Sequence, residues 1–356
     1  MALTSRLAAV LTCCAVLAAA MHYHVFAREL AVMPATGDHA ITITVRPVSY
    51  FQSSQTSRKT FGKLEFRGGL VLNSSASGFG GWSGITMDPD GRHFLAISDE
   101  GSWLSGEVTY QGLRPTGITH ARMGRLKALS GRDLGRKRDF DAESVRLISG
   151  DLDKGTVLIS FERNHRIGVF PVANGVVSKP RHYLALNRDI RRMSANRGFE
   201  AIATLKGGRY RGNVIAFSER YPGLKNRHRG WLWIGGKPQR LEMTDIGGFD
   251  VTDCVGLEDG SLLILERRFR WTEGVKMRIR HIPADKIRPG GLLDGETLLE
   301  ADLGYTIDNM EGLAAHRAAN GDLVLTLLSD NNFNQILQRT LLLQFTLKGH
   351  RQSAKG

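Results

Sequence analysis

Residues 143–163 read ESVRLISGDLDKGTVLISFER. An acid opens this stretch, a short apolar strand and an Asp-Lys-Gly turn follow, and a second apolar strand ends in Glu162-Arg163. Two apolar runs joined by such a turn are typical of a β-hairpin. Four other stretches repeat this layout, with a serine as the entry residue in the first: residues 83–100, 200–220, 253–267 and 311–330.

The spacing of the acids makes the repeat regular. Entry and exit acids are 19 residues apart in three copies, at Glu143/Glu162, Glu200/Glu219 and Glu311/Asp330. Successive exit acids are 63, 57, 47 and 64 residues apart. These intervals accommodate a four-stranded unit of roughly 40 to 50 residues with inserted loops, which is typical of a β-propeller blade.

Five blades are visible in the repeats, and the two ends of the chain predict a sixth. Residues 61–72 have no second half, and residues 341–347 have no following partner. Pairing these terminal strands in one blade would remove open sheet edges. We therefore expect an all-β, six-bladed propeller that is closed by pairing of its N- and C-terminal strands.

The N-terminus predicts export. Arg6 precedes an apolar stretch at residues 7–21, and Val25-Phe26-Ala27 resembles a cleavage site. These features are typical of a signal peptide over residues 1–27, and the stretch is short for a bilayer span. We expect a periplasmic or secreted protein without a stable membrane span after cleavage, with an uncleaved anchor as the alternative. A lead-in segment (28–58), the propeller domain (59–348) and a tail (349–356) follow.

Composition narrows the choice of partners. The 356 residues include 48 basic and 35 acidic side chains, for a net charge of +13, which favours anionic partners. The densest basic run, residues 122–138, contains no interleaved aromatic residue before Phe140, whereas single-stranded nucleic acids are bound by aromatic faces as well as charge. We expect a solvated loop there, no nucleic-acid partner, a small anionic substrate and a monomeric chain.

The repeated acids predict a metal site. Equivalent positions in successive blades fall on rings around the axis of a propeller, so the acids would converge. Two carboxylates about 5 Å apart repel by roughly 3 kcal/mol at an effective dielectric of 20, so such a ring needs cations or protons. Hard oxygen ligands favour Ca²⁺ over Zn²⁺. The predicted metal ligands are Asp99, Glu143, Glu162, Glu200, Glu219, Glu266, Glu311 and Asp330.

Three of the exit acids are followed by an arginine, at Arg163, Arg220 and Arg267. Adjacent strand residues point to opposite faces, so each arginine could form an ion pair with an acid of the next blade and serve only the scaffold. The alternative is that these arginines reach the channel mouth and bind a phosphate or carboxylate. In that interpretation they bind the substrate together with Asn331.

The chain resembles a known family at several of these positions. The resemblance rests on the motifs at residues 81–85, 97–101, 140–143, 161–163, 198–200, 309–312 and 329–333. These motifs resemble those of the phytase-like family, also described as "esterase-like activity of phytase", a group of exported bacterial proteins. The resemblance covers roughly residues 60–347. It implies a propeller distantly similar to the calcium-dependent β-propeller phytases, which hold Ca²⁺ at the channel mouth and hydrolyse phosphate esters.

The chain departs from a true phytase because it lacks a dense Asp/Glu/Lys phosphate cradle, and the resemblance transfers no catalytic residue. The expected function is calcium-dependent hydrolysis of a phosphate ester at the channel mouth. Two alternatives stay open: a non-catalytic propeller that binds an anionic component of the cell envelope, and a hydrolase of carboxylic esters.

Overall fold

The computed structural model describes residues 37–334 and 336–350. The predicted signal peptide, residues 1–27, lies outside the described residues, as does the tail from residue 351. Within the described part of the chain, no helix combines the length and the apolar character that crossing a membrane requires.

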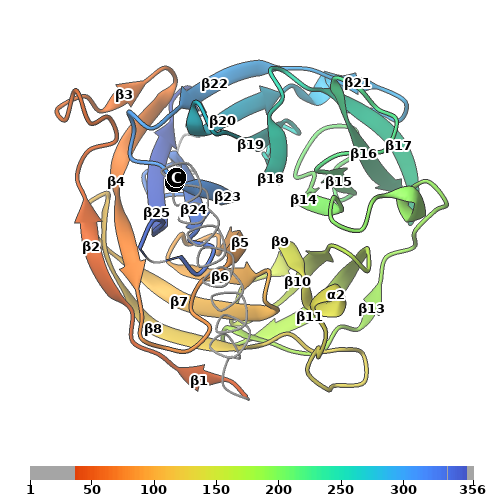
Figure 1. Ribbon diagram of the computed structural model, residues 1–356, viewed down its shortest axis with the longest axis horizontal. Helices are drawn as coiled ribbons and strands as arrows, with labels where there is room; N and C mark the ends of the chain where they lie inside the picture. Colours follow the sequence, from red (N-terminus) through yellow and green to blue (C-terminus); the bar gives the residue numbers. More distant parts are fainter. Residues whose placement is uncertain (1–36, 335, 351–356) are drawn as a thin grey trace, which may run out of the picture.

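Five β-sheets surround one central axis (Figure 1). The innermost strand of each sheet contacts the innermost strand of the next sheet, so that these strands form a ring. The inner strands are β5 (Trp82–Met87), β9 (Ala142–Gly150), β14 (Phe199–Thr204), β18 (Asp250–Gly256) and β23 (Asn309–Arg317).

In the first three blades the strands follow the chain order from the axis outward, apart from the edge strand β1 (His39–Ala40). The first adds β6 (His93–Ser98), β7 (Ser102–Gln111), β8 (Arg114–Arg125) and the short β1. The second adds β10 (Lys154–Phe161), β11 (Arg166–Ala173), β12 (Val176–Val177) and β13 (His182–Tyr183). The third adds β15 (Val214–Ser218), β16 (Arg227–Ile234), β17 (Lys237–Thr244) and β21 (Leu292–Leu293).

The fourth blade adds β19 (Leu262–Arg270), β20 (Gly274–Ile282) and β22 (Glu296–Ala301). The fifth adds β24 (Leu323–Asp330), β25 (Thr340–Leu347), β4 (Leu64–Asn73), β2 (Thr44–Val48) and β3 (Thr60–Phe61). Helical segments among the described residues are short: α2 (Lys137–Phe140) and the 3₁₀ turns η1 (Ile190–Arg192) and η2 (Ala284–Lys286).

The propeller prediction is confirmed, but the predicted sixth blade is wrong. The two terminal segments pair with each other, since β4 is antiparallel to β25. They do so as outer strands of the sheet that already contains β23 and β24. The fifth repeat supplies only three strands, so the terminal segment completes it instead of forming a separate sheet. Part of the lead-in segment belongs to this sheet as well, because β2 pairs with β4.

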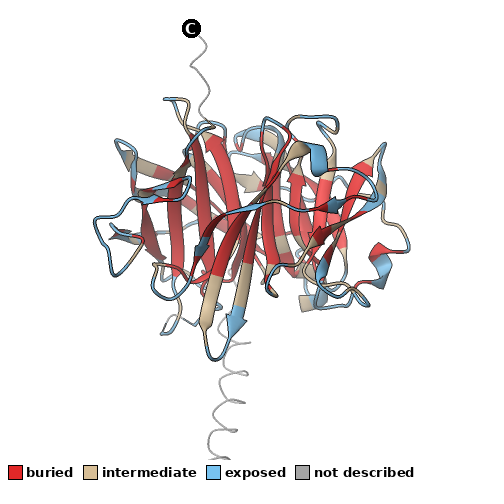
Figure 2. Ribbon diagram, turned by 90° about the horizontal axis from the view of Figure 1, so that it is seen from above, coloured by how far each residue is buried: buried red, intermediate tan, exposed pale blue. Residues whose placement is uncertain are grey.

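The hydrophobic core lies between adjacent sheets, where the strands are buried (Figure 2). All residues of β5 and β24 are buried, because each blade packs against a neighbour on both of its faces. Trp82, Trp103 and Trp231 are among the largest fully buried side chains. The described residues contain one cysteine, Cys254, which is buried and free, so packing stabilises this part of the fold.

Candidate functional site

A β-bulge opens every inner strand at the same mouth of the ring. At this end of each ladder one residue has no partner on the second strand of its blade. A bulge leaves this extra residue unpaired and redirects its side chain. The five bulge residues are Ser83, Glu143, Glu200, Thr252 and Glu311, so three of the five positions carry a glutamate.

A second ring of side chains comes from the end of the second strand of each blade. The residue opposite the one that precedes each bulge is Ser98, Phe161, Ser218, Glu266 or Ser329. The next residue along the chain occupies the ring position. These positions are Asp99, Glu162, Glu219, Arg267 and Asp330.

Nine of the ten ring residues, all except Thr252, line one cavity of about 300 Å³ on the axis, which we call the acid cavity. Eight carboxylates line it: Asp99, Asp141, Glu143, Glu162, Glu200, Glu219, Glu311 and Asp330. Only three cationic side chains line it with them: Lys137, Arg163 and Arg267. The acid cavity therefore holds a large excess of negative charge when its carboxyl groups are ionised.

Acids of the cavity or its edge already bind each of these three cations. The Nζ atom of Lys137 lies 3.1 Å from Asp99 Oδ2 and 2.9 Å from Asp141 Oδ1. Arg163 pairs with the same Asp141. The Nε atom of Arg267 lies 3.5 Å from Glu311 Oε1. A negatively charged ligand would find no spare cationic side chain in this cavity.

Burial and mutual repulsion hold protons on the carboxyl groups. Burial, and then the neighbouring charges of Asp141 and Asp99, raise the pKa of Glu143 well above its usual value. Burial raises the pKa of Glu162 and of Glu311 to about 7. Burial, with repulsion from Asp99, raises the pKa of Asp330 to about 8. In the absence of a cation, the charged form of these groups is therefore disfavoured near neutral pH.

The donor set of the acid cavity fits a hard divalent cation. Oxygen atoms of Glu162, Glu200 and Glu219 lie within 4.8 Å of one another, and so do those of Asp141, Glu143 and Glu162. Glu162 belongs to both groups, so it would take part in holding a cation at either of them. Carboxylate oxygens at this density are the ligands that Ca²⁺ prefers.

Asp99 offers a further oxygen at the edge of the acid cavity. Its Oδ1 atom is buried and has no hydrogen-bond partner. A Cβ atom on Gly81 would lie 2.3 Å from this oxygen, and Gly81 adopts φ +64°. Glycine is therefore required beside Asp99, because any side chain would occupy the position of the free carboxylate oxygen.

The structure places seven of the eight predicted ligands in the acid cavity, and the exception is Glu266. Glu266 is fully buried beside β20, where its Oε1 atom lies 2.6 Å from Arg280 Nη2. The register of the fourth blade explains the error. Glu266 is equivalent to Phe161 of the second blade, and Arg267 stands where that blade has Glu162.

The predicted substrate-binding residues are divided between different places. Arg163 and Arg267 line the acid cavity, but Arg220 lines a different pocket and forms an ion pair with Asp250 at 2.6 Å. Arg220 and Arg267 both contact an acid of the following blade, as the scaffold interpretation expected. The Asn331 side chain accepts the Phe333 backbone N–H at 3.1 Å and serves the turn, while Asn332 lines the acid cavity.

Sequence reasoning missed Asp141 and Lys137 in the acid cavity. Both lie next to the second repeat, and Asp141 lies two residues before the entry acid Glu143. Lys137 belongs to the basic run that was expected to be a solvated loop, yet α2 directs it into the cavity. The spacing of Lys137 and Asp141, four residues apart on one helical turn, was the available signal.

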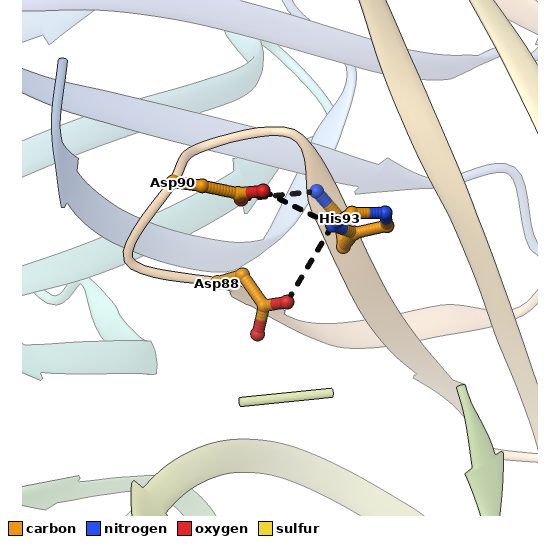
Figure 3. Close-up of side chains that lie close together, drawn as sticks. All are labelled: Asp88, Asp90 and His93. Carbon is orange, nitrogen blue, oxygen red and sulfur yellow. Dashed lines mark hydrogen bonds and ion pairs between the residues drawn. The ribbon is translucent and has the colours of Figure 1, made fainter. Parts of the chain in front are cut away.

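A third acidic group lies outside the acid cavity, in the β5–β6 turn, and contains Asp88, Asp90 and His93 (Figure 3). His93 Nδ1 lies 3.1 Å from Asp90 Oδ2 and 3.7 Å from Asp88 Oδ2. Asp90 Oδ1 accepts the Arg92 N–H at 2.8 Å, and Asp88 Oδ1 accepts the Leu152 N–H at 2.8 Å. These bonds give the two carboxylates a structural role in the turn, and we assign no ligand to them.

Residues 77–333 match the model of a family described as "Phytase-like: Esterase-like activity of phytase". No curated protein matches the chain.

Solved structures that resemble it include the β-propeller domain of Cps50 (Swd1) from Myceliophteria thermophila, with 9% identity, TM-score 0.38 and coverage of 89% of this chain and 98% of that one. Another is a gluconolactonase from Xanthomonas campestris, with 10% identity, TM-score 0.40 and coverage of 87% and 98%. At these values the likenesses carry no information about activity.

Proposed function

The chain belongs to the phytase-like family, and on this premise we propose that it is an exported hydrolase that cleaves a phosphate ester at the acid cavity with the help of calcium. One observation supports the proposal above all others. Eight carboxylates and three cations line a single axial cavity, and this arrangement is stable in its charged form only if further cations enter.

Carboxylates of the acid cavity would hold the calcium. Glu162, Glu200 and Glu219 form one ligand group, and Asp141 and Glu143 extend it through the shared Glu162. When bound, calcium supplies positive charge that neutralises a phosphoryl group and makes water in the cavity more acidic. The anionic substrate would be attracted to the calcium ions, because the cavity has no spare cationic side chain of its own.

The remaining contacts orient the ligands. The Gly198 N–H donates to Glu162 Oε1 at 3.1 Å, and the Asn332 N–H donates to Asp330 Oδ1 at 2.7 Å. Lys137 holds Asp99 and Asp141 in place on one side. Such contacts to ligand side chains fix their orientation before the metal arrives.

We expect a phosphatase assay to test this function directly. Chelator-treated protein should hydrolyse p-nitrophenyl phosphate only after calcium is added, with a difference of at least about 100-fold, because the cavity repels an anion until its charge is compensated. The assay measures release of p-nitrophenol at pH 7.5 with and without CaCl₂. An Asp153→Asn variant is the control for loss of an acid outside the acid cavity. It should show the same calcium dependence as the wild type, since Asp153 is exposed on a turn of the second blade.

A parallel assay with p-nitrophenyl butyrate distinguishes the proposed function from a carboxylic-ester hydrolase and from a non-catalytic binding protein. Turnover of the butyrate ester without turnover of the phosphate ester would replace the proposed function by a carboxylic-ester hydrolase. Absence of turnover of both esters in the presence of calcium would favour a non-catalytic binding protein.

A further inference from the structure

The opposite end of the axis contains a second cavity, which we call the distal cavity. Its volume is about 310 Å³, and all five inner strands contribute to its lining. Ser83 of β5 lines the acid cavity, while Thr86 and Met87, further along the same strand, line the distal cavity. Likewise Glu311 of β23 lines the first, and His316 the second. The two cavities are therefore opposite ends of one axial channel.

A buried ion pair separates the two cavities. Arg146 of β9 pairs with Asp253 of β18, and both side chains are almost fully buried. Arg146 also donates to the carbonyl oxygens of Ile85 and Cys254, at 2.6 and 2.8 Å. Asp253 accepts the Ser144 hydroxyl at 2.8 Å. A ligand at one end is thus separated from the other end by side chains that are already bonded to one another.

The charge of the distal cavity is opposite to that of the acid cavity. Three cationic side chains line it, Arg146, Lys206 and Arg317, against one carboxylate, Glu258. Arg317 pairs with Glu258 at 3.1 Å, and Arg146 pairs with Asp253. Among the described residues, no hydrogen bond or ion pair is found for the Lys206 ammonium group. Lys206 is an exposed side chain, and together with Arg146 and Arg317 it gives this end of the channel an excess of positive charge.

Two further polar groups of the distal cavity lack partners. His316 is 7% exposed, and its Nδ1 atom has no hydrogen-bond partner. The opposite edge of the His316 ring packs against Gly91, where an added Cβ atom would lie 2.2 Å from Nε2. The buried hydroxyl oxygen of Thr204 has no partner either. A buried polar atom without a partner is costly, so this lining is complete only with a ligand or water that hydrogen-bonds to it.

We propose that the distal cavity is a binding site for the oxyanion group of a small molecule, a phosphate or a carboxylate, with Lys206 as its principal charged contact. A small oxyanion offers several acceptor atoms to Lys206, His316 and the Thr204 hydroxyl at once. The site differs from the acid cavity because it needs no calcium: its own side chains supply the positive charge.

Calorimetric titration of chelator-treated protein tests this proposal. Inorganic phosphate and acetate are titrated separately at equal ionic strength, since nonspecific attraction to a basic protein is screened by salt. We expect saturable binding of at least one of the two anions, and the tighter one identifies the class of oxyanion. Lys206→Gln should weaken it at least 10-fold. Lys237→Gln, which removes an exposed lysine at the start of β17, should leave it unchanged.

A second variant locates the site. Arg163→Gln removes a cation of the acid cavity, and oxyanion binding should persist in it. Absence of saturable binding in the wild type, equal binding in Lys206→Gln, or loss of binding in Arg163→Gln would each overturn the proposal. None of these results depends on hydrolysis or on calcium, so failure here and failure of the proposed function are distinguishable.

Discussion

Replacing Glu162 by glutamine is expected to lower calcium-dependent turnover of a phosphate ester by at least about 100-fold. Glu162 is the carboxylate shared by the two groups of close oxygen atoms in the acid cavity. Changing a residue that merely supports a metal ligand already costs about 10- to 100-fold, so loss of a carboxylate that both groups share should cost no less. The measurement is the rate of p-nitrophenyl phosphate hydrolysis at saturating calcium.

The same substitution should not unfold the protein. The melting temperature therefore distinguishes a role of Glu162 in calcium binding from a role in stabilising the fold. A glutamine oxygen can still accept the Gly198 N–H, and the variant removes one charge from a crowded cluster. We therefore expect the chelator-treated variant to melt at or above the temperature of the chelator-treated wild type. A variant that melts several degrees lower, or that retains full calcium-dependent turnover, would contradict the assignment of Glu162.

The second large effect is expected from Arg146→Met, in the ion pair that closes the channel. Without Arg146, the carboxylate of Asp253 is left fully buried and uncompensated. Burial already raises the pKa of Asp253 to about 6 in the presence of Arg146. Breaking a buried ion pair by removing one partner costs about 3–5 kcal/mol of unfolding free energy. Urea unfolding followed by tryptophan fluorescence measures this loss.

A double variant identifies the cause of this loss. Asp253→Asn combined with Arg146→Met removes both charges, and part of the lost stability should return, because no isolated charge remains buried. Equal urea midpoints for Arg146→Met and the wild type would show that the pair does not stabilise the fold. A double variant that is as unstable as the sum of the single variants would show that the two residues act independently.

The architecture could be predicted because each blade repeats its own local signals. Apolar runs, turn residues and the 19-residue interval between acids are properties of single hairpins, so they can be recognised in the sequence alone. The number of blades could not be predicted in this way. It depends on whether β4 and β2 form a separate sheet or complete an existing one, and this is decided by long-range pairing with β25.

The positions of the site residues could likewise be predicted where local signals decide them, but not where strand pairing decides them. Glu143, Glu200 and Glu311 were predicted as ring residues, and each lies at a bulge of its inner strand. Glu266 was misplaced by one residue, because the Glu-Arg sequence of the fourth repeat looks the same as in the second. Only the pairing of Glu266 with Val251 shows that Arg267 holds the ring position. In a strand, a shift of one residue moves a side chain to the opposite face.

Calcium titration of the chelator-treated protein at pH 5.5 and pH 8 tests the convergence of the carboxylates most directly. The raised pKa values of Glu162 and Glu311, about 7, and of Asp330, about 8, mean that these groups carry protons at pH 5.5 and lose them as the pH rises. Calcium must displace those protons, so its affinity should rise with pH. We predict saturable binding at pH 8 that weakens at least about 10-fold at pH 5.5 and is impaired in Glu162→Gln. Absence of saturable calcium binding at pH 8, or binding that is equal in Glu162→Gln, would contradict the account.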